Sequence, residues 1–260
     1  MVRLNIANFF VVCFLSLQGC RQRPGDADTL VIFSASSLVD VLKSLKPEFE
    51  KLYPGYHLAL NFAGSQVLRL QIEEGASADF FFSASKRHVT ILEKKDLVEE
   101  PFLLAYNSLC LVVPWKNPAG IKSIYDLVKP VRLVIANPEV PAGRYTRELF
   151  AATSKNQNNN FENMVLNNIV SQENNVRLVR AKVELNEADA AIVYCSDATT
   201  SNKIKRIPLP EAIDTMVSYF GARTTSGKKS LQAHAWLNFM KTRNADRIFK
   251  RFGFTPIVKQ

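Results

Sequence analysis

The sequence has few of the residues on which enzyme catalysis and metal binding commonly depend. Its 260 residues include only three histidines (His57, His88 and His234), and none lies in a zinc motif such as HExxH. Ser65 follows a glycine but lacks the second glycine of the G-x-S-x-G turn of serine hydrolases. There is also no G-x-G-x-x-G or Walker A loop for nucleotide phosphates. We therefore expect neither an enzyme nor a cofactor.

Long apolar runs are also missing, and the short one at the N-terminus indicates export. Residues 9–17 are too few to cross a bilayer, which takes ~20 apolar residues. They follow Arg3 in the charged-then-apolar order of a secretory signal peptide. Residues 17–20 (LQGC) resemble the bacterial lipobox, whose cysteine is acylated and becomes the mature N-terminus. We expect residues 1–19 to be a signal peptide, Cys20 to carry a lipid anchor and polar residues 20–28 to form a tether.

Acidic residues are outnumbered by basic ones. The chain has 33 Lys and Arg against 24 Asp and Glu, a formal net charge of +9. Removal of residues 1–19, which contain Arg3 and no acid, leaves +8. A basic chain is a candidate nucleic-acid binder, but a protein exported to the periplasm or the cell surface would rarely meet nucleic acid. We expect a solvated basic surface that attracts anions in general, and no nucleic-acid partner.

The four cysteines leave room for one disulfide at most. Cys13 lies in the signal peptide and Cys20 would be acylated, so only Cys110 and Cys195 remain. Cys110 lies in the apolar run 109–113, and free cysteines are commonly buried as small apolar residues. This pattern favours two unpaired thiols, although the sequence leaves their pairing open.

Short apolar runs alternate with segments of helical periodicity. Apolar residues recur at spacings of three and four over residues 38–52, which predicts a helix that ends before Pro54. Residues 66–74 alternate like a strand but are interpreted as a helix, and residues 153–160 are polar and asparagine-rich, which predicts an exposed, mobile loop. Further strands are predicted at residues 30–33, 56–62, 80–82, 108–113, 132–136 and 190–194, and further helices at 144–152 and 176–184. This order is typical of an α/β protein with largely parallel sheets covered on both faces.

Three of the predicted strand-to-helix turns are rich in small residues. They contain Ser36 and Ser37, Gly64 and Ser65, and the Pro-Ala-Gly run at residues 141–143. Helix N-termini have unpaired N–H groups and partial positive charge, so several of them together form an anion site. A single serine at such a position is more commonly just a helix cap. Only the set as a whole points to a ligand.

Five separated motifs resemble the periplasmic molybdate-binding proteins of ABC transporters, and the similarity covers nearly the whole mature chain. Each motif is short, but their order and spacing make the resemblance specific. The motifs are residues 33–38 (FSASSL), 61–65 (NFAGS), 74–80 (EGASADF), 140–143 (VPAG) and 191–197 (AIVYCSD).

The resemblance implies which residues hold the oxyanion. Ser37 and Ser65 would supply hydroxyl and backbone donors, Ala142 and Val176 their backbone N–H groups, and Tyr194 its phenolic hydroxyl. No Lys or Arg need touch the anion. Molybdenum would therefore enter only as the bound oxyanion, without direct protein ligands to the metal. Charge-assisted bonds from neutral donors suit a fully ionised dianion.

The resemblance also implies a fold of the type II periplasmic-binding-protein class, with two α/β lobes and the ligand in the cleft between them. We expect one lobe at residues 29–106 plus 198–260 and the other at 107–197. Residues 106–108 and the segment after Asp197 would form the hinge. Closure of the lobes would then bury the anion.

The implied function is capture of molybdate or tungstate, as a monomer, for delivery to the permease of an ABC importer. One alternative keeps the binding role but changes the ligand to another tetrahedral oxyanion such as sulfate. A second is an enzyme or a transcription-factor effector domain on the same fold, against which the export signal argues. Sequence alone does not choose between molybdate and tungstate.

Overall fold

The computed structural model describes residues 29–157, 160–213, 215–225, 227 and 231–257. The predicted signal peptide, Cys20 and the tether therefore lie outside the described residues. Within the described part, no helix is both long and apolar enough to cross a membrane.

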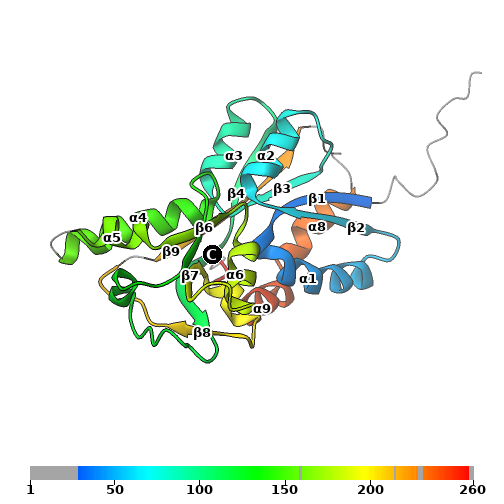
Figure 1. Cartoon of the computed structure of the whole chain (residues 1–260). Helices are drawn as coiled ribbons and strands as arrows, with labels where there is room; N and C mark the ends of the chain where they lie inside the picture. Colours follow the sequence, from blue (N-terminus) through cyan, green and yellow to red (C-terminus); the bar gives the residue numbers. More distant parts are fainter. Residues whose placement is uncertain (1–28, 158–159, 214, 226, 228–230, 258–260) are drawn as a thin grey trace, which may run out of the picture.

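The fold is built on a nine-stranded mixed sheet in the order β2-β1-β3-β9-β4-β7-β5-β6, with β8 paired to β4. Helices cover both faces of this sheet (Figure 1). The strands are β1 (Thr29–Ala35), β2 (His57–Ala63), β3 (Phe80–Ser83), β4 (Val98–Pro114), β5 (Leu133–Ala136), β6 (Ile169–Glu173), β7 (Ala190–Tyr194), β8 (Ile204–Ile207) and β9 (Met216–Thr224). The helices are α1 (Val39–Leu52), α2 (Ser65–Glu73), α3 (Lys86–Glu93), α4 (Pro141–Gln157), α5 (Phe161–Asn167), α6 (Val176–Glu184), α7 (Cys195–Thr199), α8 (Leu231–Met240) and α9 (Arg243–Arg251), with 3-10 turns η2 (Ser36–Leu38) and η3 (Ile124–Val128).

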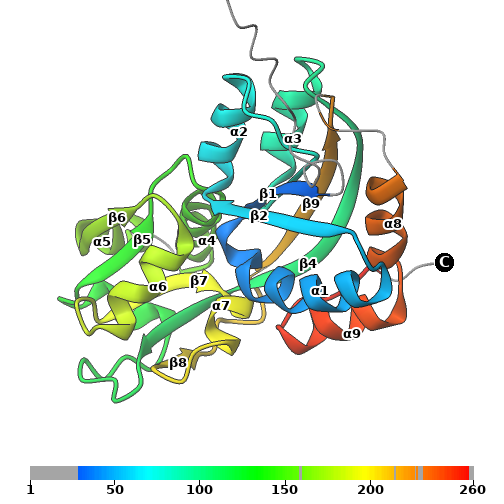
Figure 2. The same ribbon diagram turned by 90° about the vertical axis from the view of Figure 1, so that its right-hand side faces the viewer.

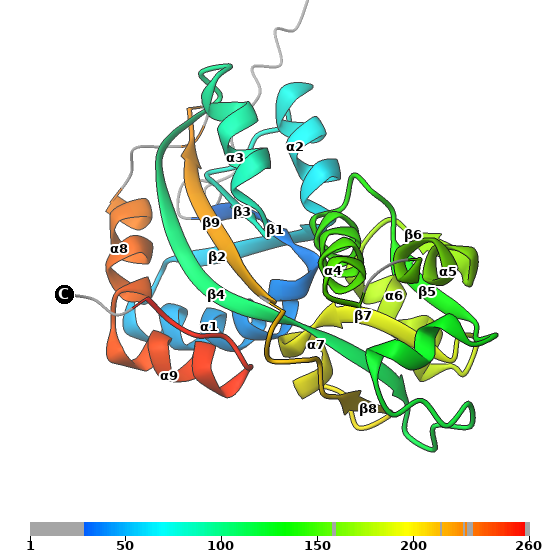
Figure 3. The same cartoon turned by 90° about the vertical axis from the view of Figure 1, so that its left-hand side faces the viewer.

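The long strand β4 connects two halves of this sheet. From Val98 to Ser108 it pairs with β9, and β9 continues through β3 to β1 and β2. From Leu109 to Pro114 it pairs with β7 and β8, and β7 continues through β5 to β6. We call these the first and second halves of the sheet. Figure 3 shows β4 passing from one to the other beside β9.

Strand direction follows the connections. The pairs β1–β2, β1–β3, β5–β6 and β5–β7 are parallel, whereas every pair formed by β4 or β9 is antiparallel. Parallel neighbours need a crossover connection, which the helices supply. The α/β class is confirmed, but β4 and β9 make the sheet mixed rather than largely parallel.

Alternating side chains of β1 and β3 pack into two separate apolar clusters. Ile32, Phe80 and Phe82 belong to the larger cluster, which includes residues of α1, α8 and α9. Phe33 and Phe81 face the opposite way, against α2 and α3. Figure 2 shows these two groups of helices on opposite sides of β1 and β2. Strands buried on both faces read as continuous apolar runs, which is why they were visible in the sequence.

The structure tests the predictions for residues 66–74, whose pattern is ambiguous, and for residues 153–160, which are predicted as a loop. The predicted helix at 66–74 is confirmed by α2. The predicted loop at 153–160 is wrong over its first part, because α4 continues to Gln157. Thr153 is fully buried, and its hydroxyl donates to the Leu149 carbonyl oxygen at 2.8 Å. A threonine here can lie inside a helix because its hydroxyl bonds to the backbone one turn earlier. The polar composition of the segment does not reveal this bond.

The preference for two unpaired thiols is also wrong, because Cys110 and Cys195 form a disulfide. β4 and β7 are antiparallel neighbours with Leu109 opposite Tyr194, which places each cysteine one residue further along its own chain. Their Cα atoms are 5.1 Å apart, within the usual range for a disulfide. The pairing of strands so distant in sequence is what the sequence did not show.

Candidate functional site

Six chain segments meet around a small cavity where the two halves of the sheet join. Turn η2, the start of α2 and Ala84, just after β3, come from the first half; the starts of α4 and α6 and the end of β7 come from the second. We call this the central cavity. All five residues predicted to contact an anion lie in its wall, namely Ser37, Ser65, Ala142, Val176 and Tyr194.

Two glycines allow the turns to approach this closely. A Cβ added at Gly143 would lie 2.0 Å from the Asn137 carbonyl oxygen, so α4 can begin directly beyond β5 only without a side chain there. A Cβ at Gly64 would lie 2.6 Å from the carbonyl oxygen of Asn174. Gly64 and Asn174 belong to different halves, so a side chain at position 64 would hold the halves apart.

Backbone donors remain free at the helix starts that face the cavity. Asn175 caps α6, and its side-chain oxygen accepts from the N–H groups of Arg177 and Leu178 at 2.9 and 3.1 Å. The Val176 N–H has no partner among the described residues. The Ala142 N–H, in the first turn of α4, likewise has none there. Both N–H groups are therefore available to an anion.

The hydroxyl groups of Ser37, Ser65 and Tyr194 in the wall are also available as donors. The Ser65 Oγ accepts from the Ala84 N–H at 3.1 Å, and the Ser37 Oγ accepts from the Tyr219 hydroxyl at 2.8 Å. Each serine thus keeps its own proton for another acceptor. The Tyr194 hydroxyl is buried without a hydrogen-bond partner in the described part of the chain. An unpaired buried hydroxyl is costly, which makes a ligand at this point favourable.

None of the described residues that line the central cavity is charged. Burial raises the pKa of Tyr194 well above its usual value, so its hydroxyl keeps its proton. The chemistry of the site is therefore a set of neutral N–H and O–H donors, without a nucleophile and base pair. Such a set can bind an oxyanion.

Three polar contacts close the two halves around the cavity. The Gln66 Nε2 donates to the Asn174 carbonyl oxygen at 2.9 Å, and an Arg144 nitrogen donates to the Ser85 Oγ at 3.2 Å. The third contact is an ion pair, described next, between α1 and α6. The central cavity has a volume of about 10 Å³, room for roughly one water. An oxyanion is larger, so its entry requires the halves to separate.

Arg177 forms an ionic bridge behind the cavity. Its guanidinium lies 2.6 Å from the Asp40 carboxylate on α1 and 2.9 Å from the Asp197 carboxylate on α7. Asp197 is fully buried, and burial raises its pKa to about 6 despite the opposing attraction of Arg177 and Arg180. Arg177 directly follows Val176, so the bridge also fixes the start of α6.

Sequence reasoning missed Tyr219, Asn107 and Arg177, which support the site from behind. Tyr219 and Asn107 lie on β9 and β4 and are buried. Neither residue belongs to a short motif or a helix start, so no local signal marks them. Only the spatial pairing of β4 with β9 brings them behind Ser37.

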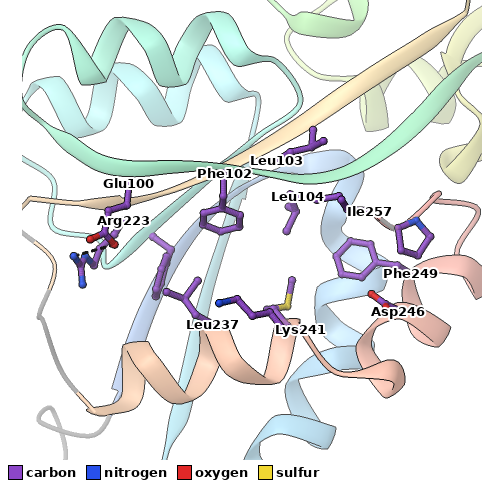
Figure 4. A pocket seen from close by; sticks show the side chains of 13 residues that line it. Glu100, Phe102, Leu103, Leu104, Arg223, Leu237, Lys241, Asp246, Phe249 and Ile257 are labelled. Atoms are coloured by element: carbon purple, nitrogen blue, oxygen red, sulfur yellow. Dashed lines mark ion pairs between the residues drawn. The ribbon is translucent and has the colours of Figure 1, made fainter. Parts of the chain in front are cut away.

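A larger cavity of about 370 Å³ lies between the sheet and helices α8 and α9 (Figure 4). Most of its wall is apolar and includes Phe102, Leu237 and Phe249. The Arg223 guanidinium at its edge is already paired with Glu99 and Glu100, at 3.0 and 3.2 Å. The described residues that line this cavity include no serine, threonine or tyrosine hydroxyl.

Two α/β halves joined by β4, with a donor-lined cavity where they meet, define a binding protein of the type II periplasmic-binding-protein fold. Residues 30–255 match the model of the bacterial extracellular solute-binding proteins, and the chain belongs to that family. It is therefore an exported binding protein rather than an enzyme.

Relatives extend the comparison. The molybdate-binding protein ModA of Mycobacterium tuberculosis is 31% identical over 231 residues, covering 88% of this chain and 85% of that protein. A putative ABC transporter substrate-binding lipoprotein of Bacillus subtilis is 29% identical, covering 94% of this chain and 95% of its own length. The solved substrate-binding domain of a putative molybdenum ABC transporter from Clostridium difficile is 26% identical, with a TM-score of 0.66 and coverage of 88% and 99%.

Proposed function

We propose that this protein captures molybdate or tungstate outside the cytoplasm and delivers it to the permease of an ABC importer. The observation that carries the proposal is the convergence of Ser37, Ser65, Ala142, Val176 and Tyr194 on one cavity with their donors free. Similarity to molybdate-binding proteins over most of the chain supports the choice of ligand. Molybdate would be the transported ligand and not a cofactor.

The donor set suits a tetrahedral dianion. Two serine hydroxyls, one phenol and the N–H groups of Ala142 and Val176 approach from both halves, so each oxygen of the anion can accept a bond. Hydrogen bonds to an ionised acceptor are about twice as strong as neutral ones, and the partial charge at several helix starts adds to them. The neutral donors thus replace the water molecules that hydrate the anion in solution, and no buried cation is needed to balance its charge.

The two halves of the sheet would act as lobes. We assign residues 29–106 and most of the segment after residue 215 to one lobe, and residues 107–197 to the other. β8 would join the second lobe, because it pairs with β4 there. β4 would be the hinge strand near residues 106–108. Opening would admit the anion, and closure would restore the contacts of Gln66 and Arg144 across the cleft.

Lipid at Cys20 would keep the protein near its permease. The lipobox-like residues 17–20 motivate this assignment, and the similarity to a Bacillus subtilis substrate-binding lipoprotein supports it. The protein would act as a monomer on a tether formed by residues 20–28. Mass spectrometry of the mature N-terminus should find diacylated or triacylated Cys20, whereas an unmodified terminus elsewhere would remove the anchor.

Calorimetric and thermal-shift titrations with molybdate, tungstate and sulfate test the ligand. Molybdate at 100 times its dissociation constant should stabilise the protein by ~2.7 kcal/mol. Tighter binding of sulfate than of molybdate would replace the proposal by the other-oxyanion alternative. No response to any of the three from folded protein would refute an oxyanion function.

Paired serine replacements test the site. Replacing Ser37 and Ser65 together by alanine should weaken molybdate binding at least a hundredfold, since two charge-assisted bonds of ~1.5–3 kcal/mol each are lost. The matched control replaces Ser44 and Ser201, whose hydroxyls bond Arg251 and Glu184 instead. Equal affinity in both double variants would reject the assigned site.

A further inference from the structure

Helix α9 carries exposed basic side chains along one side. The opposite side of the helix is buried in the larger apolar cluster through Ala245, Ile248 and Phe249. The cations follow one another at steps of four, three and one residues, which places them on a single stripe of an α-helix. We call this exposed stripe the basic face, and its members are Arg243, Arg247, Lys250 and Arg251.

The charge of the basic face is not compensated on the protein. Arg243, Arg247 and Lys250 form no ion pair or side-chain hydrogen bond within the described residues. The fourth member, Arg251, donates to the Ser44 Oγ of α1 at 2.6 Å, and a hydroxyl carries no charge. The face therefore presents cations that remain available to an outside anion.

Two acidic residues lie near these cations but have other partners or surroundings. Glu48 of α1 lines the same surface groove as Arg247 and accepts a hydrogen bond from Asn244 at 3.3 Å. Asp246 belongs to α9 but lines the apolar cavity between the sheet and helices α8 and α9 (Figure 4). Neither carboxylate neutralises the basic face.

Ordinary helix energetics do not account for this arrangement. Like charges four residues apart destabilise a helix, and Arg247 has such a neighbour on each side, in Arg243 and Arg251. Lys250 and Arg251 suit the negative end of the helix dipole, but Arg243 in the first turn opposes the positive end. An anionic surface held against the helix would offset these repulsions.

The basic face lies one helix away from the start of β1, where the tether would join the folded part. Thr29 begins β1 and pairs with His57 at the start of β2. The next residue, Leu58, accepts a hydrogen bond from Lys46 of α1 at 2.6 Å. Helix α1 in turn packs against α9 (Figure 2). A tether formed by residues 20–28 spans at most ~30 Å, so an anchored protein keeps this region near lipid.

We propose that the basic face docks on the anionic phospholipid surface of the membrane that holds the protein. The inference rests on the export and anchoring given under the proposed function, and it is independent of which oxyanion is bound. Guanidinium and ammonium groups form charge-assisted hydrogen bonds with phosphate oxygens, and each cation near such a surface contributes roughly fivefold in binding. The lipid would fix one point of the protein and α9 a second, which holds the tethered body in one orientation.

Vesicle co-sedimentation tests the basic face without the anchor. The protein is the mature chain with Cys20→Ser, which cannot be acylated, and the vesicles contain phosphatidylcholine with or without phosphatidylglycerol. We expect binding only to vesicles with phosphatidylglycerol at ~0.1 M salt, and its loss at ~1 M salt, where the Debye length falls from about 10 to 3 Å. Folded protein that does not bind these vesicles at the lower salt would overturn the proposal and leave an acidic protein as the partner of this face.

A triple variant locates the binding on α9. Arg243→Gln/Arg247→Gln/Lys250→Gln removes three charges and keeps good helix formers, so the helix should persist. Its binding to phosphatidylglycerol vesicles should weaken roughly a hundredfold, from roughly fivefold per cation. If circular dichroism shows that this variant does not fold, Arg247→Gln alone should weaken vesicle binding roughly fivefold. An unchanged affinity in the folded variant would overturn the proposal.

A matched control removes the same charge from the second half of the sheet. Lys203→Gln/Lys205→Gln/Arg206→Gln changes three exposed cations at strand β8, none of which has an acidic partner within the described residues. Its vesicle affinity should change less than about threefold. An equal loss in both triple variants would show an effect of net charge alone and would refute a docking face on α9.

Oxyanion titration of the same proteins separates this inference from the proposed ligand. Neither set of replaced residues lines the central cavity, so both triple variants should bind molybdate as the wild type does. Loss of vesicle binding with molybdate affinity retained supports the basic face. Failure of the wild type to bind any oxyanion would refute the proposed ligand, whereas failure to bind anionic vesicles would refute only the docking surface.

Discussion

Removal of the Cys110–Cys195 disulfide should lower stability far more than it lowers ligand affinity. The bond joins residues 85 positions apart in the sequence, so it closes a long loop in the unfolded chain. The chain-entropy relation for a loop of that length gives about 4.6 kcal/mol at 25 °C. The Cα atoms are 5.1 Å apart on paired segments, so the folded state should keep its structure without the bond.

Urea unfolding of the mature protein, oxidised and reduced, measures this effect. At a slope of ~3 kcal/mol per molar urea, a loss of about 4.6 kcal/mol moves the midpoint by about 1.5 M. The Cys110→Ala/Cys195→Ala double variant should unfold at the midpoint of the reduced wild type and should not respond to reductant. Coincident fluorescence and circular dichroism transitions would establish that the comparison is two-state.

Affinity provides the second half of the test. Tyr194 directly precedes Cys195, but β7 also holds it through its pairing with β4, where it lies opposite Leu109. Molybdate affinity should therefore change less than threefold after reduction. The reasoning is refuted if thiol counting shows complete reduction and the unfolding midpoint does not move.

Three further perturbations address the support of the site. Gly143→Ala should cost about 3 kcal/mol of unfolding free energy, as overpacking does, because its Cβ would lie 2.0 Å from a backbone oxygen; near-wild-type urea stability would contradict this. Arg177→Met should lower the unfolding free energy by about 2 kcal/mol, less than the loss for a fully buried pair because Arg177 is partly exposed. A urea midpoint above that of the wild type would disprove the bridge. The pKa of Asp197 is about 6 in the folded protein, against 3.8 for an unperturbed Asp, so the folded state binds its proton more tightly than the unfolded state does. Its contribution to stability is therefore complete below pH 3.8 and falls by about 3 kcal/mol as the pH rises through 6. The difference in unfolding free energy between the wild type and Asp197→Asn should fall in this way with pH. A difference that does not change with pH would show that the Asp197 carboxyl is unperturbed.

The five predicted site residues were accessible from the sequence because they occur in local patterns. Ser37, Ser65, Ala142 and Val176 stand at or next to helix starts, and Tyr194 ends a wholly apolar strand. Small residues at such turns are visible without knowledge of the fold. The structure places all five around one cavity, although their contact with an anion stays a prediction.

The missed features are those that depend on strand pairing. Only residues 108–113 of β4 were predicted as a strand, since Glu99, Glu100 and Pro101 interrupt its beginning and the polar pair at residues 107–108 separates the apolar run 102–106 from the predicted strand. β9 and the edge strand β6 were not predicted, since β6 alternates between half-buried and exposed positions with few apolar residues. Without β4 and β9 side by side, the roles of Asn107 and Tyr219 and the nearness of the two cysteines could not be inferred.

The basic charge of the chain and the neutrality of its cavity serve different purposes. Arg144 and Arg177 are the first cations of α4 and α6, yet Arg144 pairs with Glu148 at 2.6 Å and Arg177 with Asp40 and Asp197. Their charge is compensated locally, so neither offers an unpaired guanidinium to the ligand. The surplus of Lys and Arg elsewhere can attract anions of every kind over a Debye length of about 8 Å, but it cannot tell them apart. Discrimination between anions would therefore rest on the N–H and O–H donors of the central cavity rather than on the net charge.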